Sequence, residues 1–302
     1  MGKNGKGDCF YPKRDIMILK KNSLIDGLLY RLLYWLHVLK NIRPADWRIA
    51  LGIFLSMLLD IPLYFFFRNN PLILLGGKIF IPKDNLYFYI RSRTDDLYFV
   101  TPRREGIIED FILNSLQQGD VFIDVGANIG YYSVHAARRV GKTGKVIAVE
   151  PIPDTVNILK MNVFLNKLEN VEIVDKAAWN SSGKRINISV PSIGCDLRFF
   201  GSSSQSTSLR NNYASVNTIA LDDLKPALGV NQHVILKIDV EGSEKEVLRG
   251  AASILNNISL LYVECQKDNV NSILMQIEKS FLCRIIEVPH CVHLLCRKYS
   301  RQ

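Results

Sequence analysis

A short turn with two glycines follows an apolar run and contains residue types that can hold a nucleoside. The run Val121–Val125 leads into Gly126, Asn128 and Gly130. A glycine directly after a strand allows a backbone shape that a side chain forbids, and the later glycine lets the next helix pack closely. Asn128 stands where a dinucleotide fingerprint has the glycine that admits a pyrophosphate. The turn therefore favours a nucleoside cofactor without phosphates.

An acidic residue at the end of the next apolar run fits the same site. Glu150 follows 145–149 and lies 24 residues after Gly126. A carboxylate at this place can accept hydrogen bonds from both ribose hydroxyls. The alternative is an ordinary glycine turn with an unrelated glutamate. A strand, turn, helix, strand and terminal acid in this order disfavour that alternative.

Three charged residues alternate at the end of another apolar run, which is the expected place for the reaction. Lys237, Asp239 and Glu241 share one side if the strand continues with a period of two. Buried charges are costly unless they are paired, so one interpretation is a structural ion pair. The other is that Asp239 faces the cofactor or the substrate nucleophile and is the first candidate to remove its proton. Glu241 would then orient a substrate or a neighbouring helix N-terminus, and Lys237 would tune the acids or bind an anion.

The C-terminal half contains further polar candidates. Glu264 ends an apolar run and either lines the same pocket or forms a salt bridge. The run 290–296 has two His and two Cys, which are zinc-binding types, but their spacing fits no usual motif and we predict no metal. The polar segment 201–212 is either a lid, with Gln205 or Arg210 contacting an acceptor, or disordered.

Apolar runs and helical patterns alternate regularly after residue 120. We expect strands at 121–125, 145–150, 171–174, 185–190, 234–240 and 260–264, helices at 129–140, 153–166, 243–255 and 270–281, and a hairpin of 284–288 with 292–297. This order predicts a doubly wound α/β fold, with a mostly parallel seven-stranded sheet and an antiparallel hairpin at its C-terminal edge.

The N-terminal part has a different character. Residues 1–48 hold ten Lys or Arg and four Asp, a net charge of +6, so the other 254 residues share +3. Helices are expected at 15–40 and 47–60, strands at 78–81, 86–91 and 97–100, and a helix at 104–117. We divide the chain into a basic, apolar helical arm (1–71), a small hairpin with a lead-in helix (72–118) and a catalytic domain (119–302).

The segment 49–67 is almost wholly apolar, and its 19 residues approach the ~20 that span a bilayer. Asp60 and Pro62 in its second half disfavour a span. A buried helix that ends near Asp60 before an extended aromatic run, a helix lying on a membrane surface, and a true span remain open. The basic charge of the arm fits either an anionic lipid surface or a solvated end.

Three separate segments carry a resemblance to a known family. VFIDVGANIGYYSVHAA, KVIAVEPIP and VILKIDVEGSEKEVLRGA resemble, in this order, the FkbM family of class I S-adenosylmethionine-dependent methyltransferases. The resemblance covers about residues 84–289. It implies that the turn, with Asp124, Gly126, Ala127, Asn128 and Gly130, holds the methionine part and the ribose edge. It further implies ribose contact by Glu150, a cofactor role for the helix residue Asn162, and adenine proximity for Asp175, Lys176, Ala177 and Ala178.

The combined interpretation is an S-adenosylmethionine-dependent methyltransferase with a helical arm. The resemblance implies a hydroxyl oxygen on a sugar, a glycan or lipid-linked molecule, or a small metabolite as the acceptor, and no nucleic acid partner. The expected location is the cytoplasm, with peripheral contact at the inner face of the cell membrane left open by the arm. The alternatives are a nicotinamide-dependent oxidoreductase on a similar fold and a non-catalytic, membrane-tethered nucleoside-binding protein.

Overall fold

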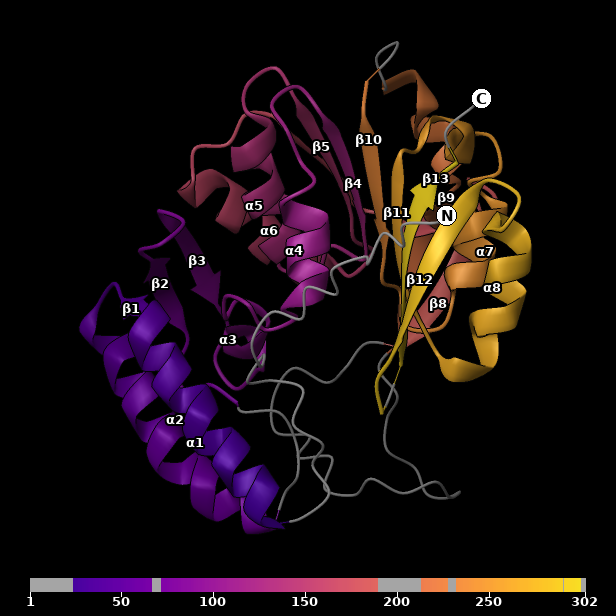
Figure 1. Cartoon of the computed structure of the whole chain (residues 1–302). Helices are drawn as coiled ribbons and strands as arrows, with labels where there is room; N and C mark the ends of the chain where they lie inside the picture. Colours follow the sequence, from indigo (N-terminus) through magenta and orange to yellow (C-terminus); the bar gives the residue numbers. More distant parts are fainter. Residues whose placement is uncertain (1–23, 67–71, 190–212, 228–231, 290, 300–302) are drawn as a thin grey trace, which may run out of the picture.

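The centre of the molecule is a seven-stranded sheet with helices on both faces (Figure 1). A computed structural model describes residues 24–66, 72–189, 213–227, 232–289 and 291–299. In spatial order the strands are β12 (Phe281–Glu287), β13 (Val292–Lys298), β11 (Leu260–Cys265), β10 (Val234–Ile238), β4 (Val121–Val125), β5 (Lys145–Val149) and β6 (Val171–Val174). β13 runs against both of its neighbours, and the other six strands point the same way. The expected fold class is confirmed.

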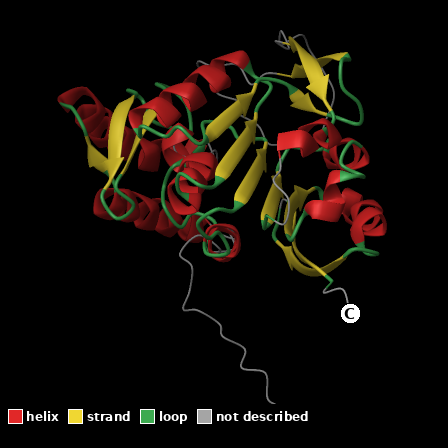
Figure 2. Ribbon diagram, turned by 90° about the horizontal axis from the view of Figure 1, so that it is seen from above, coloured by secondary structure: helices red, strands yellow, loops and turns green. Residues whose placement is uncertain are grey.

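The central strands β4 and β10 are buried on both faces, and their alternate residues face two different cores. Phe122 and Ile235 belong to one core, whereas Ile123 and Leu236 belong to the other. Figure 2 shows helices on both sides of the central strands. The helices around the sheet are α4 (Ile107–Leu113), α5 (Tyr131–Val140) and α6 (Pro153–Leu165) with the first core, and α7 (Glu244–Arg249) and α8 (Val270–Ile277) with the second.

A smaller sheet lies beside the carboxyl end of β6. It consists of β7 (Ala177–Ala178), β9 (Tyr213–Ile219) and β8 (Arg185–Ser189), in that order. The strand β8 was expected at 185–190, but β9 was not expected. Short 3-10 turns complete the domain: η2 (Leu221–Ala227), η3 (Ile254–Asn257) and η4 (Lys267–Asn269). The polar segment 201–212 lies outside the described residues.

The N-terminal part is a helical hairpin joined to a small sheet. Figure 1 shows α1 and α2 side by side at the periphery. Tyr34, Trp35 and Ile49 lie in the same core as Phe122 of the central sheet, so the hairpin is anchored by burial. The elements are α1 (Leu24–Asn41), β1 (Arg43–Pro44), α2 (Trp47–Phe66), β2 (Gly77–Ile81), β3 (Leu86–Ile90) and α3 (Asp96–Phe99).

The second helix differs from the expectation. We expected it to end near Asp60, but α2 continues through Pro62 to Phe66. Asp60 is held inside the hairpin, where its carboxylate pairs with Arg31 at 2.6 Å and accepts the Trp35 Nε1–H at 2.9 Å. A proline removes only one helical hydrogen bond, so the packed helix can pass it. Within the described part of the chain, no helix combines the length and apolar character needed to cross a bilayer.

Two further local expectations are wrong. The run 97–100 is part of the short helix α3 rather than a strand, because the buried Asp96 pairs with Arg91 at 2.8 Å and also accepts its N–H. The helix expected at 243–255 stops at Arg249. There Gly250 passes so close to the small sheet that a Cβ would lie 2.0 Å from the Trp179 carbonyl oxygen.

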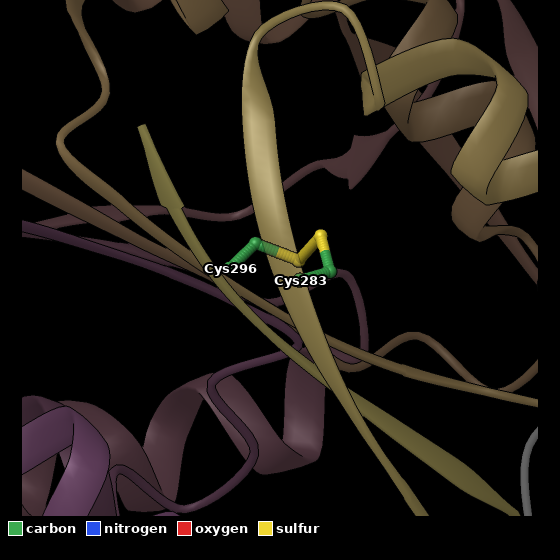
Figure 3. The surroundings of a disulfide bond; sticks show 2 residues. All are labelled: Cys283 and Cys296. Carbon is green, nitrogen blue, oxygen red and sulfur yellow. A yellow bond between two sulfur atoms is a disulfide. The ribbon is translucent and has the colours of Figure 1, made fainter. Parts of the chain in front are cut away.

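The edge of the central sheet carries a disulfide that spacing could not assign. Cys283 of β12 and Cys296 of β13 face each other in register, with Cα atoms 4.0 Å apart, and they form a disulfide bond (Figure 3). Cys265 and Cys291 are free thiols. The bond ties the outermost strand to the sheet.

The Arg31–Asp60 pair generates a stability prediction. The Arg31 side chain is 1% exposed, so Asp60→Ala leaves a buried charge without its carboxylate. We expect a loss of about 3–5 kcal/mol in the free energy of unfolding, measured by denaturant titration. Asp110→Ala is the matched control, since it removes a carboxylate paired with the exposed Arg103 and costs less than about 1 kcal/mol. Equal losses in the two variants would contradict a buried structural pair.

Candidate active site at the carboxyl ends of the strands

Strand register brings the polar candidates into one row. Ile238 pairs with Val125 on one side and with Val263 on the other, and Val125 pairs with Val149. Each next residue along these strands therefore falls at the same edge of the sheet, which is where open α/β sheets bind ligands. Continuing the register across the sheet, the row is Asp175, Glu150, Gly126, Asp239, Glu264 and His293.

The glycine turn has the geometry that its sequence predicts. Gly126 has φ +76°, and a Cβ there would lie 1.8 Å from the carbonyl oxygen of Asp239. Glycine is therefore required both by the backbone conformation and by the close approach of the two loops. Gly130, at φ +90°, starts α5, and a Cβ there would meet Leu159 of α6 at 2.4 Å. Asn128 also has a positive φ of 50°.

Glu150 is fixed beside this turn. Its carboxylate oxygens accept the backbone N–H groups of Asn128 and Ile152, each at 3.0 Å. Burial raises the pKa of Glu150, and the two N–H groups partly offset the rise. Each carboxylate oxygen can accept more than one hydrogen bond, so the oriented group is still able to receive ribose hydroxyls.

A buried charge cluster joins the turn to the next strand. Lys237 of β10 lies 3.1 Å from Asp124 and 3.6 Å from Asp239, and donates to the Gly126 carbonyl at 3.4 Å. Asp124 also accepts the Ser133 hydroxyl at 2.6 Å. Burial by itself would lower the pKa of Lys237, but Asp124 and then Asp239 raise it above its usual range. The lysine is therefore a cation that holds two carboxylates in place.

Glu241 does not join this cluster, contrary to the expected alternation. The strand β10 ends at Ile238 rather than at Val240, and Glu241 is exposed with φ +52°. Because Glu241 has a left-handed backbone conformation beyond the end of the strand, the alternation of side chains along β10 does not extend to it. Lys237 and Asp239 are brought together as expected, and Glu241 lies outside their contacts.

A glutamate from the lead-in segment, which sequence reasoning missed, lies next to the cluster. Glu105 accepts the Tyr132 hydroxyl and pairs with Arg104, whose guanidinium stacks 5.1 Å from the ring centres of Tyr98 and Phe99. Burial would raise the pKa of Glu105, but the Arg104 charge and the tyrosine hold it below its usual value. Lys237 lies 5.4 Å over the Tyr132 ring, which links the two groups. No local pattern marks Glu105.

Glu264 stands opposite His293 in the sheet, and a tyrosine connects them. The Tyr262 hydroxyl lies 3.2 Å from Glu264 and 2.9 Å from Nδ1 of His293. Burial, followed by the charges of Asp239 and Glu105, raises the pKa of Glu264 to about 7. Burial lowers the pKa of His293. The sequence offered Glu264 as a pocket residue or a strand-end salt bridge, but only the strand pairing identifies His293 as its neighbour.

Cys291 completes a group of three potential metal-ligating residues. The ligand atoms of Glu264, Cys291 and His293 all lie within 4.8 Å of one another. This arrangement has the residue types of a zinc site with an open position, although we predicted no metal from the sequence. The prediction that the site works without a metal stays a prediction.

Asn162 has its amide occupied by the protein. Its Oδ1 accepts the Tyr89 N–H at 2.7 Å, and its Nδ2 donates to the carbonyls of Ile129 and Tyr89 at 2.8 and 3.4 Å. Asn166, one turn later, binds Tyr87 in the same way. The two asparagines thus bond backbone N–H and C=O groups of β3, and Asn162 also holds the carbonyl of Ile129 in the cofactor turn. Direct contact between Asn162 and a cofactor stays a prediction.

The remaining predicted cofactor residues follow β6. Asp175 is exposed beside the position of Glu150, Lys176 is half-buried, and Ala177 and Ala178 are buried in β7. This placement is next to the ribose acid, as the adenine contact requires. The contact itself stays a prediction.

Comparisons with known proteins agree with this geometry. The methyltransferase FkbM domain matches residues 124–281, which include the turn, Glu150, Asp239 and Glu264. Hexuronic acid methyltransferase AglP of Haloferax volcanii is 28% identical over 162 residues, or 54% of this chain and 62% of that protein. Methyltransferase sdnD of Sordaria araneosa is 26% identical over 198 residues, or 56% of this chain and 74% of that protein.

Solved structures give a more distant likeness. A SAM-dependent O-methyltransferase from Thermotoga maritima is 15% identical, with a TM-score of 0.38, over 75% of this chain and 79% of that chain. The match to AglP spans less than two thirds of its length, whereas the FkbM domain match spans more than half of this chain. The chain therefore belongs to the FkbM family of class I S-adenosylmethionine-dependent methyltransferases.

Proposed function

We propose that the chain transfers a methyl group from S-adenosylmethionine to a hydroxyl oxygen of a neutral sugar, a glycan or lipid-linked molecule, or a small alcohol. The observation that carries this proposal is the row of residues at the carboxyl edge of the sheet. It puts the acids Asp239 and Glu264 directly beside the turn and Glu150. A cofactor in the turn would thus have its reacting end next to groups that can accept a proton.

The described residues fit S-adenosylmethionine chemically. The molecule has a ribose diol and two cationic groups, and the turn is bordered by the carboxylates Glu150, Asp124 and Asp239. When bound, it supplies an activated methyl group, whose transfer to a hydroxyl leaves neutral S-adenosylhomocysteine and one proton for a base. Glu150 would hold the ribose, and Lys237 would keep Asp124 and Asp239 oriented toward the cofactor and the acceptor.

We assign the proton to Glu264, with Asp239 positioning the acceptor. Asp239 already has Lys237 as a counter-ion 3.6 Å away, so its carboxylate is engaged in an ion pair. Glu264 has a pKa of about 7, near the working pH at which a general base is most effective. Tyr262 and His293 fix the orientation of its carboxylate.

The charges around the site favour an uncharged acceptor. Asp239, Glu264 and Glu105 are acidic, whereas the basic residues Lys237 and Arg104 are both paired with acids. An acceptor carboxylate would meet like charges in a poorly solvated place, which is unfavourable. The relative AglP is named for a hexuronic acid, and we infer that this chain differs from it in acceptor charge.

The acceptor class is tested with labelled S-adenosylmethionine. We expect labelled methyl groups to appear on neutral glycan or lipid extracts, and product mass analysis to place them on oxygen. Uronic acid acceptors should react at least about fivefold more slowly, since one like-charge contact costs on the order of 1 kcal/mol or more. Preferred methylation of a uronic acid would overturn the charge argument, and no transfer to any extract would favour a non-catalytic binding protein.

The cofactor site is tested by Glu150→Gln. Losing a charged hydrogen-bond acceptor should weaken S-adenosylmethionine binding about 10- to 100-fold in isothermal titration. Glu172→Gln is the control, because Glu172 is an exposed glutamate of β6 paired with Lys145. NAD is the control ligand and should not bind. Unchanged binding in Glu150→Gln would show that the ribose acid is wrongly assigned.

The base is tested by the pH dependence of the rate. An acid with a raised pKa is protonated below that value, so catalysis by Glu264 should rise with pH to a plateau, with a midpoint near 7. Glu264→Gln should lose this rise and most of the rate, typically 10²–10⁴-fold. A midpoint clearly below the usual histidine pKa would instead identify His293, whose pKa is lowered.

A further inference from the structure

The exposed sides of α1 and α2 are apolar, which is unusual for surface helices. On α1 the exposed residues between 26 and 39 are all leucines, spaced by three or four residues so that they form one stripe: Leu29, Leu32, Leu36 and Leu39. On α2 a similar stripe begins at the turn and consists of Trp47, Leu51, Phe54 and Leu58, with Leu59 beside it. We call these nine residues the hairpin face.

The hairpin face is not a set of slightly exposed core residues. Leu36 is 54% exposed, Phe54 is 55% exposed and Trp47 is 74% exposed. The opposite sides of the two helices are buried in the core through residues such as Tyr34 and Ile49. The charged pair in the middle of the hairpin, Arg31 with Asp60, is turned inward and neutralises itself. The side of the hairpin that faces away from the core is therefore apolar, although a surface in contact with water is normally polar.

Positive charge gathers where the two helices meet. The basic residues near the exposed Trp47 are also exposed: Lys40, Arg43 and Arg48. The carboxylate of the exposed Asp46 accepts a hydrogen bond from the Ile49 N–H at 3.0 Å. In sequence, the 23 residues that precede the other end of α1 hold six Lys or Arg and two Asp, so they also carry a net positive charge. Tryptophan and basic side chains next to an apolar helix face are the composition of a helix at a membrane interface.

We propose that the hairpin face binds an anionic lipid bilayer, with α1 and α2 lying along its surface. The leucines and Phe54 would enter the acyl boundary, while Lys40, Arg43 and Arg48 would contact lipid phosphates. A bilayer fits better than a second protein copy, because the face offers no exposed hydrogen-bonding side chain between residues 26 and 39. Among the described residues 26–60, the exposed charged side chains lie at the turn between the two helices. Lying on the surface also agrees with the absence of a spanning helix from the described residues.

The docked hairpin would stand close to the reaction site. Tyr34 of α1 contacts the ring of Tyr98 with centroids 6.0 Å apart, and a His37 ring nitrogen lies 2.7 Å from the Pro102 carbonyl oxygen. The same segment provides Arg104, which stacks on Tyr98 and pairs with Glu105. Within the proposed function, this connection favours an acceptor hydroxyl at a lipid surface. The docking itself does not depend on methyl transfer.

Vesicle flotation of the full chain tests the docking. We expect binding to mixed phosphatidylcholine–phosphatidylglycerol vesicles and weaker binding to phosphatidylcholine alone. Leu36→Gln with Phe54→Gln should reduce the bound fraction about tenfold or more. Phe164→Gln with Leu282→Gln is the matched control, since these apolar residues are 80% and 67% exposed elsewhere on the molecule. Lys40→Ala and Arg48→Ala should each cost about fivefold on the mixed vesicles only.

Quenching of tryptophan fluorescence is a second measurement, and it tests the docking without relying on variants that could fail to fold. Brominated lipids should quench the fluorescence of Trp47, and Trp47→Phe should remove this quenching, because Trp35 is buried and Trp179 lies at the small sheet beside Ile219, outside the hairpin. Failure of the wild-type chain to float, or an equal loss in the control variant, would overturn the proposal. So would a face variant that converts a dimer to a monomer without changing flotation. Flotation without methyl transfer to any acceptor would refute the proposed function and leave the docking intact.

Discussion

The structure depends on a lysine that is buried among carboxylates at the centre of the sheet. Lys237 contacts Asp124 of β4 and Asp239 of the following loop, on the two strands between which the strand order reverses. Lys237 and Asp124 are almost fully buried, and neither charge could be buried alone at an acceptable cost; the partly exposed Asp239 adds a second negative charge beside the lysine. The cluster fixes the spacing between the cofactor turn and the loop after β10, and Gly126 allows the backbones to meet there.

The same constraint gives the two ends of the site different chemistry. On the β5 side, Glu150 is held by backbone N–H groups, so its carboxylate is oriented for hydrogen bonding. On the β11 side, burial and then the charges of Asp239 and Glu105 raise the pKa of Glu264. Under the proposed function, one edge of the sheet would thus contain an acid that binds the cofactor and another that accepts a proton, although both are glutamates at the ends of parallel strands.

The elements before the central sheet belong to the active site as much as to the surface. Glu105 reaches the cluster from the segment before α4. Tyr98 and Phe99 stack on the neighbouring Arg104, and Tyr98 also contacts Tyr34 of the hairpin. A shared apolar core joins α1 and α2 to one face of the central sheet, whose carboxyl edge carries the polar row. This continuity gives a physical reason for an apolar hairpin and a methyltransferase domain to occur in one chain.

Sequence by itself determined the order and type of the main elements, because apolar periodicity and glycine positions act locally. It identified the turn at Gly126, the acid at Glu150 and the pair Lys237–Asp239, and the FkbM resemblance named the cofactor. It could not place Glu105 or pair Cys283 with Cys296, and it gave the wrong structure for 97–100 and the wrong position for Glu241. Glu105 is placed by its contact with Tyr132 of α5, and the disulfide by strand register, whereas the helix at 96–99 follows from the short-range salt bridge of Asp96 with Arg91. Only tertiary structure decided the first two, since the hydrogen bonds that set register join residues that are far apart in the chain.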